Sequence, residues 1–312
     1  MGASSSPSAF PGGAARLDGD VGWVLLAGDA APRLGAALAW ARRAGVRDLH
    51  VVVDEPEASG LVARRAALCA PAPTVWVVDG ASLAPATAAP APVPLPAPSA
   101  PELRALLVDA GLTVVDEDGM ALGELLGLEV ARITHGPDGP VLDVGVGKAD
   151  RELTAMAHAE ATDAARVARV VDIVRAERRP GAPPHPINQL VPERWLRASL
   201  VAEPALVDAA ELHPVPSVVG RTNLKDVGVA TAVGTDLDGA PLVVTCSVGV
   251  DLDLVPSAAD DRAAHAPGAR LVLAVPARDA LGLTADLAAV LDPPAEVRPV
   301  DGDWRIPWSA SA

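Results

Sequence analysis

The sequence predicts a mixed α/β protein with an N-terminal βαβαβ unit, an Ala/Pro-rich linker, and two tandem units that each combine a β-hairpin with a helix. Three observations support this fold class. Short apolar runs alternate with helical patterns near the N-terminus, one stretch is almost entirely Ala and Pro, and two similar hairpin patterns lie about a hundred residues apart. We therefore divide the chain into residues 1–20, expected to be disordered, the βαβαβ unit at 21–80, the linker at 81–101, and the duplicated region at 102–312.

The N-terminal unit is predicted from apolar runs that alternate with helical spacing. The run from Val21 to Gly28 has the length and composition of a buried strand. Leu34, Leu38 and Ala41 recur at helical spacing before a glycine that marks a helix end. The remaining elements are predicted as a strand at 49–53, a helix at 59–68 and a strand at 74–78. Because short connections join these elements, we expect the strands to be parallel.

Residues 81–101 separate this unit from the rest of the chain. They are almost entirely Ala and Pro. Proline has no backbone N–H to donate, and such stretches favour the extended polyproline II conformation. The segment is therefore predicted to be a linker or a long surface loop.

The region after the linker is predicted to begin with a helix at 101–110 and a short strand at 113–115. Two extended segments follow, at 127–134 and 140–146, and the Gly136-Pro-Asp-Gly139 sequence between them is a strong hairpin signal. Further helices are expected at 151–179, 187–200, 256–265 and 280–291, and further strands at 227–233, 241–250, 270–275 and 296–300.

A second hairpin pattern resembles the first. Residues 128–147 and 228–249 each have Asp-Gly in the turn, a Pro soon after it, and Val-Gly near the end of the second strand. Each is followed by a charged helix start, at Asp150 or at Asp260. The pattern indicates a duplicated hairpin-plus-helix unit, although any two antiparallel hairpins share some of these features.

Composition narrows the class of partner. The 312 residues carry a formal net charge of -15, which repels polyanions and favours a protein partner over nucleic acid. The Ala-, Arg- and Pro-rich, Lys- and Tyr-poor composition is typical of a GC-rich bacterial genome. The two cysteines have no spaced partners, no secretory signal is apparent, and no apolar run is long enough to cross a membrane. We therefore expect a soluble cytoplasmic protein.

Common nucleotide-binding and hydrolase motifs are absent from the sequence. The Gly145-Val-Gly-Lys148 sequence lacks both the earlier Gly and the following Ser or Thr of a phosphate-binding loop. The segment from Gly28 to Gly35 has too few glycines for a dinucleotide-binding fingerprint. Neither a nucleophile elbow nor a His-Glu-x-x-His zinc motif is present.

One pair of carboxylates is a candidate site. Glu129 lies on the first predicted strand of the first hairpin and Asp143 on the second. Adjacent antiparallel strands can bring two such side chains together on one face. Paired carboxylates suit Mg or Mn, because hard cations prefer oxygen ligands. The alternative is that both carboxylates simply face solvent on an exposed hairpin.

The order helix, acidic strand, turn, acidic strand and helix resembles the PD-(D/E)XK nuclease superfamily over residues 101–179, and the topology recurs in 217–300. The resemblance implies restriction-endonuclease-like units, metal ligands at Glu129 and Asp143, a helical acid at Glu124, and a catalytic Lys148. The family places its lysine two residues after the second acid, where this chain has Gly145. The second hairpin lacks the acids and is expected to be inactive.

Three hypotheses follow. The leading one is a non-catalytic scaffold or interaction protein on a degenerate nuclease-like fold, with a surface around Trp195 as a candidate contact. The first alternative is a divergent Mg-dependent nuclease, a phosphodiester hydrolase acting through Glu129, Asp143 and Lys148 with Mg or Mn. The second alternative is a small-molecule-binding α/β protein, with its site at the carboxyl ends of the N-terminal strands near Gly28 and Asp54.

Overall fold

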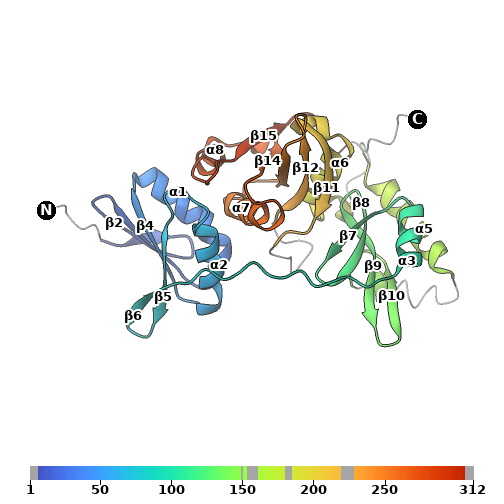
Figure 1. The fold of residues 1–312 in the computed structure, drawn as a ribbon, viewed down its shortest axis with the longest axis horizontal. Helices are drawn as coiled ribbons and strands as arrows, with labels where there is room; N and C mark the ends of the chain where they lie inside the picture. The colour runs from blue at the N-terminus through green and yellow to red at the C-terminus, as the bar shows by residue number, and fades with distance from the viewer. Residues whose placement is uncertain (1–5, 149, 153–160, 180–184, 219–227, 306–312) are drawn as a thin grey trace. The chain divides into compact units, whose positions relative to one another are not determined.

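The computed structural model describes residues 6–148, 150–152, 161–179, 185–218 and 228–305. The described chain is a mixed α/β protein with three β-sheets of six, four and five strands (Figure 1), which confirms the predicted mixed α/β class. It divides into two compact units: the first comprises 1–91 and 249–299, and the second comprises 92–248 and 300–312. No helix of the described residues is long and apolar enough to cross a membrane.

The six-stranded sheet contains the predicted βαβαβ unit. Strand order follows chain order, and β3, β4 and β5 pair in parallel, as predicted from the short connections. Helix α1 ends at Gly45, whose positive φ of 69° is a common glycine helix stop. The elements are β1 (Ser8–Phe10), β2 (Gly13–Asp18), β3 (Val21–Leu26), α1 (Leu34–Ala44), β4 (Asp48–Val53), α2 (Pro56–Ala66), β5 (Thr74–Asp79) and β6 (Ser82–Pro85).

Two expectations about the ends of this unit are corrected. The prediction that residues 1–20 are disordered is wrong for 8–18, which form β1 and β2. Strand β2 pairs antiparallel with β3 and so satisfies backbone groups that would otherwise lie at an open sheet edge. Its small residues gave no alternating apolar signal. The predicted linker begins with β6, and residues 86–100 contain no helix or strand.

The four-stranded sheet follows the linker. Its strands are antiparallel in the order β10-β9-β8-β7, and the predicted hairpin is confirmed as β9–β10. Strand β8 was not predicted, and it places Glu124 on a strand instead of the helix that the nuclease resemblance implied. The elements are α3 (Pro101–Asp109), β7 (Thr113–Glu117), β8 (Met120–Leu125), β9 (Leu128–Gly136), β10 (Gly139–Val144) and α5 (Asp163–Glu177).

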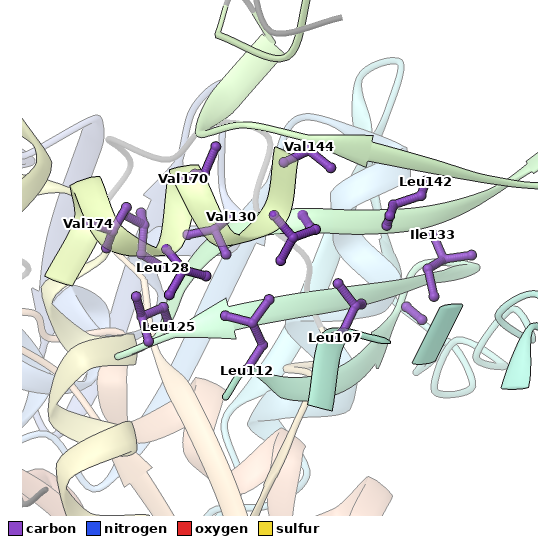
Figure 2. Close-up of a cluster of buried hydrophobic side chains, with 14 of the residues drawn as sticks. Leu107, Leu112, Leu125, Leu128, Val130, Ile133, Leu142, Val144, Val170 and Val174 are labelled. Carbon is purple, nitrogen blue, oxygen red and sulfur yellow. The ribbon is translucent and has the colours of Figure 1, made fainter. Parts of the chain in front are cut away.

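The predicted helix at 151–179 is only partly described. Residues 147, 148 and 150–152 are helical, α5 forms the C-terminal part, and residues 153–160 lie outside the described residues. The predicted stripe of Val167, Val170, Val171 and Val174 is buried as expected. Figure 2 shows Val170 and Val174 of this stripe against apolar side chains of β8, β9 and β10. One face of the four-stranded sheet is thus the core face, and polar side chains gather on the other.

The remaining elements form the five-stranded sheet and its helices. Strand order is β11-β12-β13-β14-β15, and the predicted second hairpin is confirmed as β12–β13. The predicted helix at 187–200 splits into a 3-10 turn, η2 (Pro186–Gln189), and α6 (Pro192–Ala202). The other elements are η3 (Pro204–Val207), β11 (Ala209–Val215), β12 (Ala230–Asp236), β13 (Pro241–Cys246), α7 (Leu254–His265), β14 (Arg270–Pro276), η4 (Ala277–Asp279), α8 (Gly282–Ala288) and β15 (Glu296–Val300).

The five-stranded sheet repeats the element order of the six-stranded sheet. In both, an antiparallel hairpin precedes helix, strand, helix and strand. After the hairpin, Gly28 N–H donates to Asp54 at 3.0 Å in one sheet, and Gly249 N–H donates to Asp279 at 2.8 Å in the other. The four-stranded sheet is an antiparallel meander instead. The hairpins matched in the sequence therefore lie in sheets of different topology.

Distant parts of the first unit are joined by backbone hydrogen bonds. Cys69 and Leu291 form an isolated antiparallel bridge. It is flanked by two reciprocal bonds, from Ala70 N–H to Val290 O at 2.8 Å and from Asp292 N–H to Leu68 O at 2.9 Å. Gly35 N–H at the start of α1 also donates to the buried Asp253 carboxylate at 3.0 Å.

Candidate functional site

The face of the four-stranded sheet opposite α3 and α5 carries the predicted site residues, and we call it the charged face. Asp143 lies directly opposite Arg132 on the β9–β10 ladder. Glu129 lies opposite Glu124 on β8, because the register shifts by one residue between Gly123 and Glu124. This bulge turns Glu129 to the same face as Arg132, whereas regular alternation over three residues would turn it to the core.

Each predicted metal ligand is paired with an arginine. Arg132 Nε donates to Asp143 Oδ2 at 3.3 Å, and Arg151 Nη1 donates to Glu129 Oε1 at 2.8 Å. The first pair is partly exposed, with 37% of the Asp143 side chain accessible, whereas the Glu129 side chain is 14% accessible. The carboxylates are therefore neutralised by cations that belong to the chain itself.

Burial and charge act in opposite directions on Glu129. Burial raises the pKa of its carboxyl group, while Arg151, and after it Arg132 and Arg194, lower it, and the net shift is upward. A buried carboxylate without such cations would tend to take up a proton. The arginines thus keep a charged group tolerable on a half-buried sheet face.

A pocket of about 380 Å³ opens beside these pairs. It is lined by Arg132, Asp143, Lys148, Arg151 and Glu152. The structure thus places Asp143 and Lys148 on one concave surface. Glu129 is not among the residues that line this pocket, but it is bonded to Arg151, which does line it. The five residues that line the pocket all carry charged side chains, three cations and two carboxylates, whereas hydrophobic and aromatic residues predominate around typical small-molecule pockets.

The charged face continues into a more deeply buried network. Arg194 donates to both Glu117 oxygens, at 2.6 and 2.8 Å, and to Glu124 at 2.9 Å. Arg197 donates to the other Glu124 oxygen at 2.6 Å, and both of these side chains are 3% accessible. Burial lowers the pKa of Arg194, but Glu124 and Glu117 raise it above its ordinary value overall. This network ties α6 to β7 and β8.

The charged face does not offer a ready site for a divalent cation. Within the described ranges, no group of three or more His, Cys, Asp or Glu side chains is arranged to hold a metal ion. A cation bound by Glu129 and Asp143 would have to displace the guanidinium groups of Arg151 and Arg132. Glu124, the third acid implied by the nuclease resemblance, is already shared by two arginines.

Trp195, around which the scaffold hypothesis placed a candidate contact surface, is buried together with Arg178. Trp195 is 1% accessible and Arg178 is fully buried. The Arg178 guanidinium lies 4.3 Å from the Trp195 ring centroid and donates to the carbonyl oxygens of Leu126, Ile187 and Leu190. Burial lowers the pKa of Arg178 to about 9. The expectation of a contact surface around Trp195 is therefore wrong, because these side chains stabilise the second unit from within.

The two residues of the alternative small-molecule site, Gly28 and Asp54, are hydrogen-bonded to each other. Gly28 N–H, which would face a ligand at the end of β3, donates to Asp54 Oδ1. The bond joins the loops after two neighbouring parallel strands.

Sequence reasoning did not identify the network partners of Glu129 and Asp143. Arg132 lies three residues after Glu129 and Arg151 eight residues after Asp143. Arg132 could have been found from the sequence, because a basic residue on one strand of a predicted hairpin can pair with an acid directly opposite on the other strand. No comparable signal existed for Arg151, whose pairing depends on the chain turning back after β10.

Comparison with known proteins gives no relative. No family model, no curated protein and no solved structure matches the chain.

Proposed function

We propose that the chain is a non-catalytic interaction protein, in which the acidic residues of the charged face have a structural role. The observation that carries this proposal is the pairing of Glu129 with Arg151 and of Asp143 with Arg132. Ion pairs of this kind hold neighbouring strands and the following helix together. Buried members of the network are costly to break, since a lost partner leaves an uncompensated charge.

The proposal is tested by thermal unfolding with and without millimolar Mg²⁺ or Mn²⁺. We expect the unfolding temperature of the wild type to stay within about 1 °C, because the carboxylates of Glu129 and Asp143 are each paired with an arginine. A metal at a hundredfold its dissociation constant would add about 2.7 kcal/mol. For a unit of this size, that stabilisation would raise the unfolding temperature by roughly 5–10 °C.

Two variants make this experiment specific. The double variant Glu129→Gln/Asp143→Asn removes both charges with little change in volume, and Glu152→Gln neutralises another carboxylate of the same pocket as a control. A metal-dependent shift in the wild type and in the control, absent from the double variant, would overturn the proposal. That result would favour the divergent nuclease instead.

The nuclease alternative keeps one supporting observation. Asp143 and Lys148 line the same pocket, so a lysine is available beside one of the proposed metal ligands. Glu129, the other proposed metal ligand, is however paired with Arg151, and we therefore place the nuclease second. The small-molecule alternative at Gly28 and Asp54 has no comparable support, since those two groups bond to each other.

A further inference from the structure

The six-stranded sheet buries only one of its faces. Val24 and Val51, which are paired on β3 and β4, are fully buried. The alternate residues are only half-buried, and Figure 1 shows α1 and α2 on the same side of this sheet. The uncovered side, which we call the open face, presents apolar and aromatic side chains that include Trp23, Leu25, His50, Val52, Trp76 and Leu83.

An aromatic cluster lies at the centre of the open face. Trp23 stacks on His50, with ring centroids 4.2 Å apart and 14° between planes. Trp76 Nε1–H donates to His50 Nδ1 at 3.0 Å, and His50 Nε2 lies 3.3 Å from Asp48 Oδ2. The whole chain has only six Trp, one Phe and no Tyr. Placing two of these seven on one half-buried face is typical of an interface, where Trp is enriched.

The matching face of the five-stranded sheet is covered. Gly249 occupies the position of Gly28, because each glycine donates its N–H to an aspartate in the loop after the next strand. Three residues before each glycine, Cys246 on β13 therefore corresponds to Leu25 on β3. Every residue of β13 after Pro241 is buried, which means that both of its faces are covered. Helix α6 packs against β11, β12 and β13.

Helix α6 shows what kind of element covers such a face. It is amphipathic, and its apolar side consists of Trp195, Leu196 and Leu200, each at most 1% accessible. It also contributes a basic residue, Arg197, whose guanidinium donates to backbone carbonyl oxygens of β11 and β12. The six-stranded sheet has the same strand arrangement and no such helix among the described residues.

The charges of the open face favour a protein over nucleic acid. Asp48 points to the same face as His50 and is 61% accessible, and Asp18 lies on that face opposite Val21. Aromatic sheet faces also stack nucleic-acid bases, but they do so beside cations that hold phosphates. Here Arg16, which lies opposite Trp23 on β2, has a carboxylate beside it, that of Asp18 at 3.7 Å.

From these observations we infer that the open face of the six-stranded sheet binds an amphipathic helix of a partner protein, with an apolar or aromatic side on Trp23, Trp76 and Leu83 and a basic residue near Asp48. This inference rests on the proposed interaction function and names its partner class. The metal titration tests the four-stranded sheet and the peptide experiment below tests the six-stranded sheet, so failure of one proposal does not imply failure of the other.

The test uses helical peptides selected by display, from a library built on an amphipathic helix, against the intact protein. The selected peptides are titrated into protein with ¹⁵N-labelled tryptophan. We expect the indole N–H signals of Trp23 and Trp76 to shift while that of the buried Trp195 does not. Leu83→Glu should weaken peptide binding at least tenfold. Val141→Glu is the control, because Val141 is 43% accessible against 44% for Leu83 and lies on β10; it should change affinity less than twofold.

Three outcomes would overturn the inference. These are a library that yields no enriched peptide, selected peptides that shift indoles other than Trp23 and Trp76, and equal weakening of binding by Leu83→Glu and Val141→Glu. A shift of the Trp23 and Trp76 signals with protein concentration alone would assign the open face to a second copy of this chain instead. All variants are first compared by circular dichroism, so that loss of binding is not confused with loss of fold.

Discussion

Asp253 gives the first unit a pH dependence that can be calculated from the structure. Its side chain lies at the start of α7 and accepts a hydrogen bond from Gly35 N–H at the start of α1. Its pKa is raised from 3.8 to about 7, mainly by burial; Asp251 and Asp29 also raise it, whereas the Gly35 N–H bond and Arg65 lower it. The Asp253 side chain therefore remains protonated in the folded protein at pH values where it is ionised in the unfolded chain.

The sign and size of the effect follow from linkage. Because the folded state holds this proton more tightly, the stability contributed by Asp253 is greatest below its unfolded pKa of 3.8 and is lost as pH rises through about 7. Between pH 5 and pH 8 the loss is about 3 kcal/mol. For a unit of this size, that corresponds to a fall of roughly 8 °C in unfolding temperature.

The assay compares Asp253→Asn with the wild type by thermal unfolding from pH 5 to pH 8. Asparagine still accepts the Gly35 N–H bond but does not ionise, so the variant should lose most of the calculated pH dependence and exceed the wild type in stability at pH 8. Asp54→Asn is the matched control, since Asp54 also accepts a glycine N–H but is exposed. If Asp253→Asn keeps the wild-type pH dependence, the reasoning is refuted.

Three further predictions concern the packing of each unit. Glu124→Ala should lower the free energy of unfolding by about 3–5 kcal/mol in chemical denaturation, because it leaves Arg194 and Arg197 buried without a shared partner. The double variant Glu124→Leu/Arg197→Leu should lose less stability than the sum of its two single changes, and strict additivity would contradict this prediction. Leu291→Cys should form a disulfide with Cys69 on oxidative refolding, because the two residues lie directly opposite each other as a non-hydrogen-bonded antiparallel pair, in which side chains are close. Free thiols in both positions after refolding would count against the bridge. Gly127→Ala should destabilise the protein far more than Gly19→Ala. Both glycines have positive φ, but a Cβ at Gly127 would lie 2.2 Å from backbone atoms of Arg194, whereas a Cβ at Gly19 would have no atom within 4 Å. Equal unfolding midpoints of the two variants would refute the close contact.

Much of the fold was predictable because local patterns agree with the tertiary structure. The valine stripe of α5 and the Gly-Pro-Asp-Gly turn between β9 and β10 each carry their signal within a few residues. Strands β2, β8 and β11 were missed for a common reason. Each contains Gly, Pro or charged residues, such as Glu124 or Pro214, and so lacks the apolar alternation that marks a strand in the sequence.

The candidate site was predictable only in part. Strand pairing could be inferred, so a shared surface for Asp143 and a residue of β9 was foreseeable. The residue directly opposite Asp143 is Arg132, and Glu129 reaches the charged face only because of the bulge, which has no sequence signature here. The arginines of α6 lie about 70 residues from Glu124, and no local rule connects them.

The role of Glu129 and Asp143 is tested most directly by paramagnetic broadening with Mn²⁺. Amide signals of β9 and β10 are followed by NMR as Mn²⁺ is added below one equivalent to the wild type and to Glu129→Gln/Asp143→Asn. If the two carboxylates serve as partners of Arg151 and Arg132, the amides of Val130 and Val144 should broaden no more than those near other exposed carboxylates, in both proteins. Selective broadening of these amides in the wild type, abolished in the double variant, would contradict the structural role and establish a metal site.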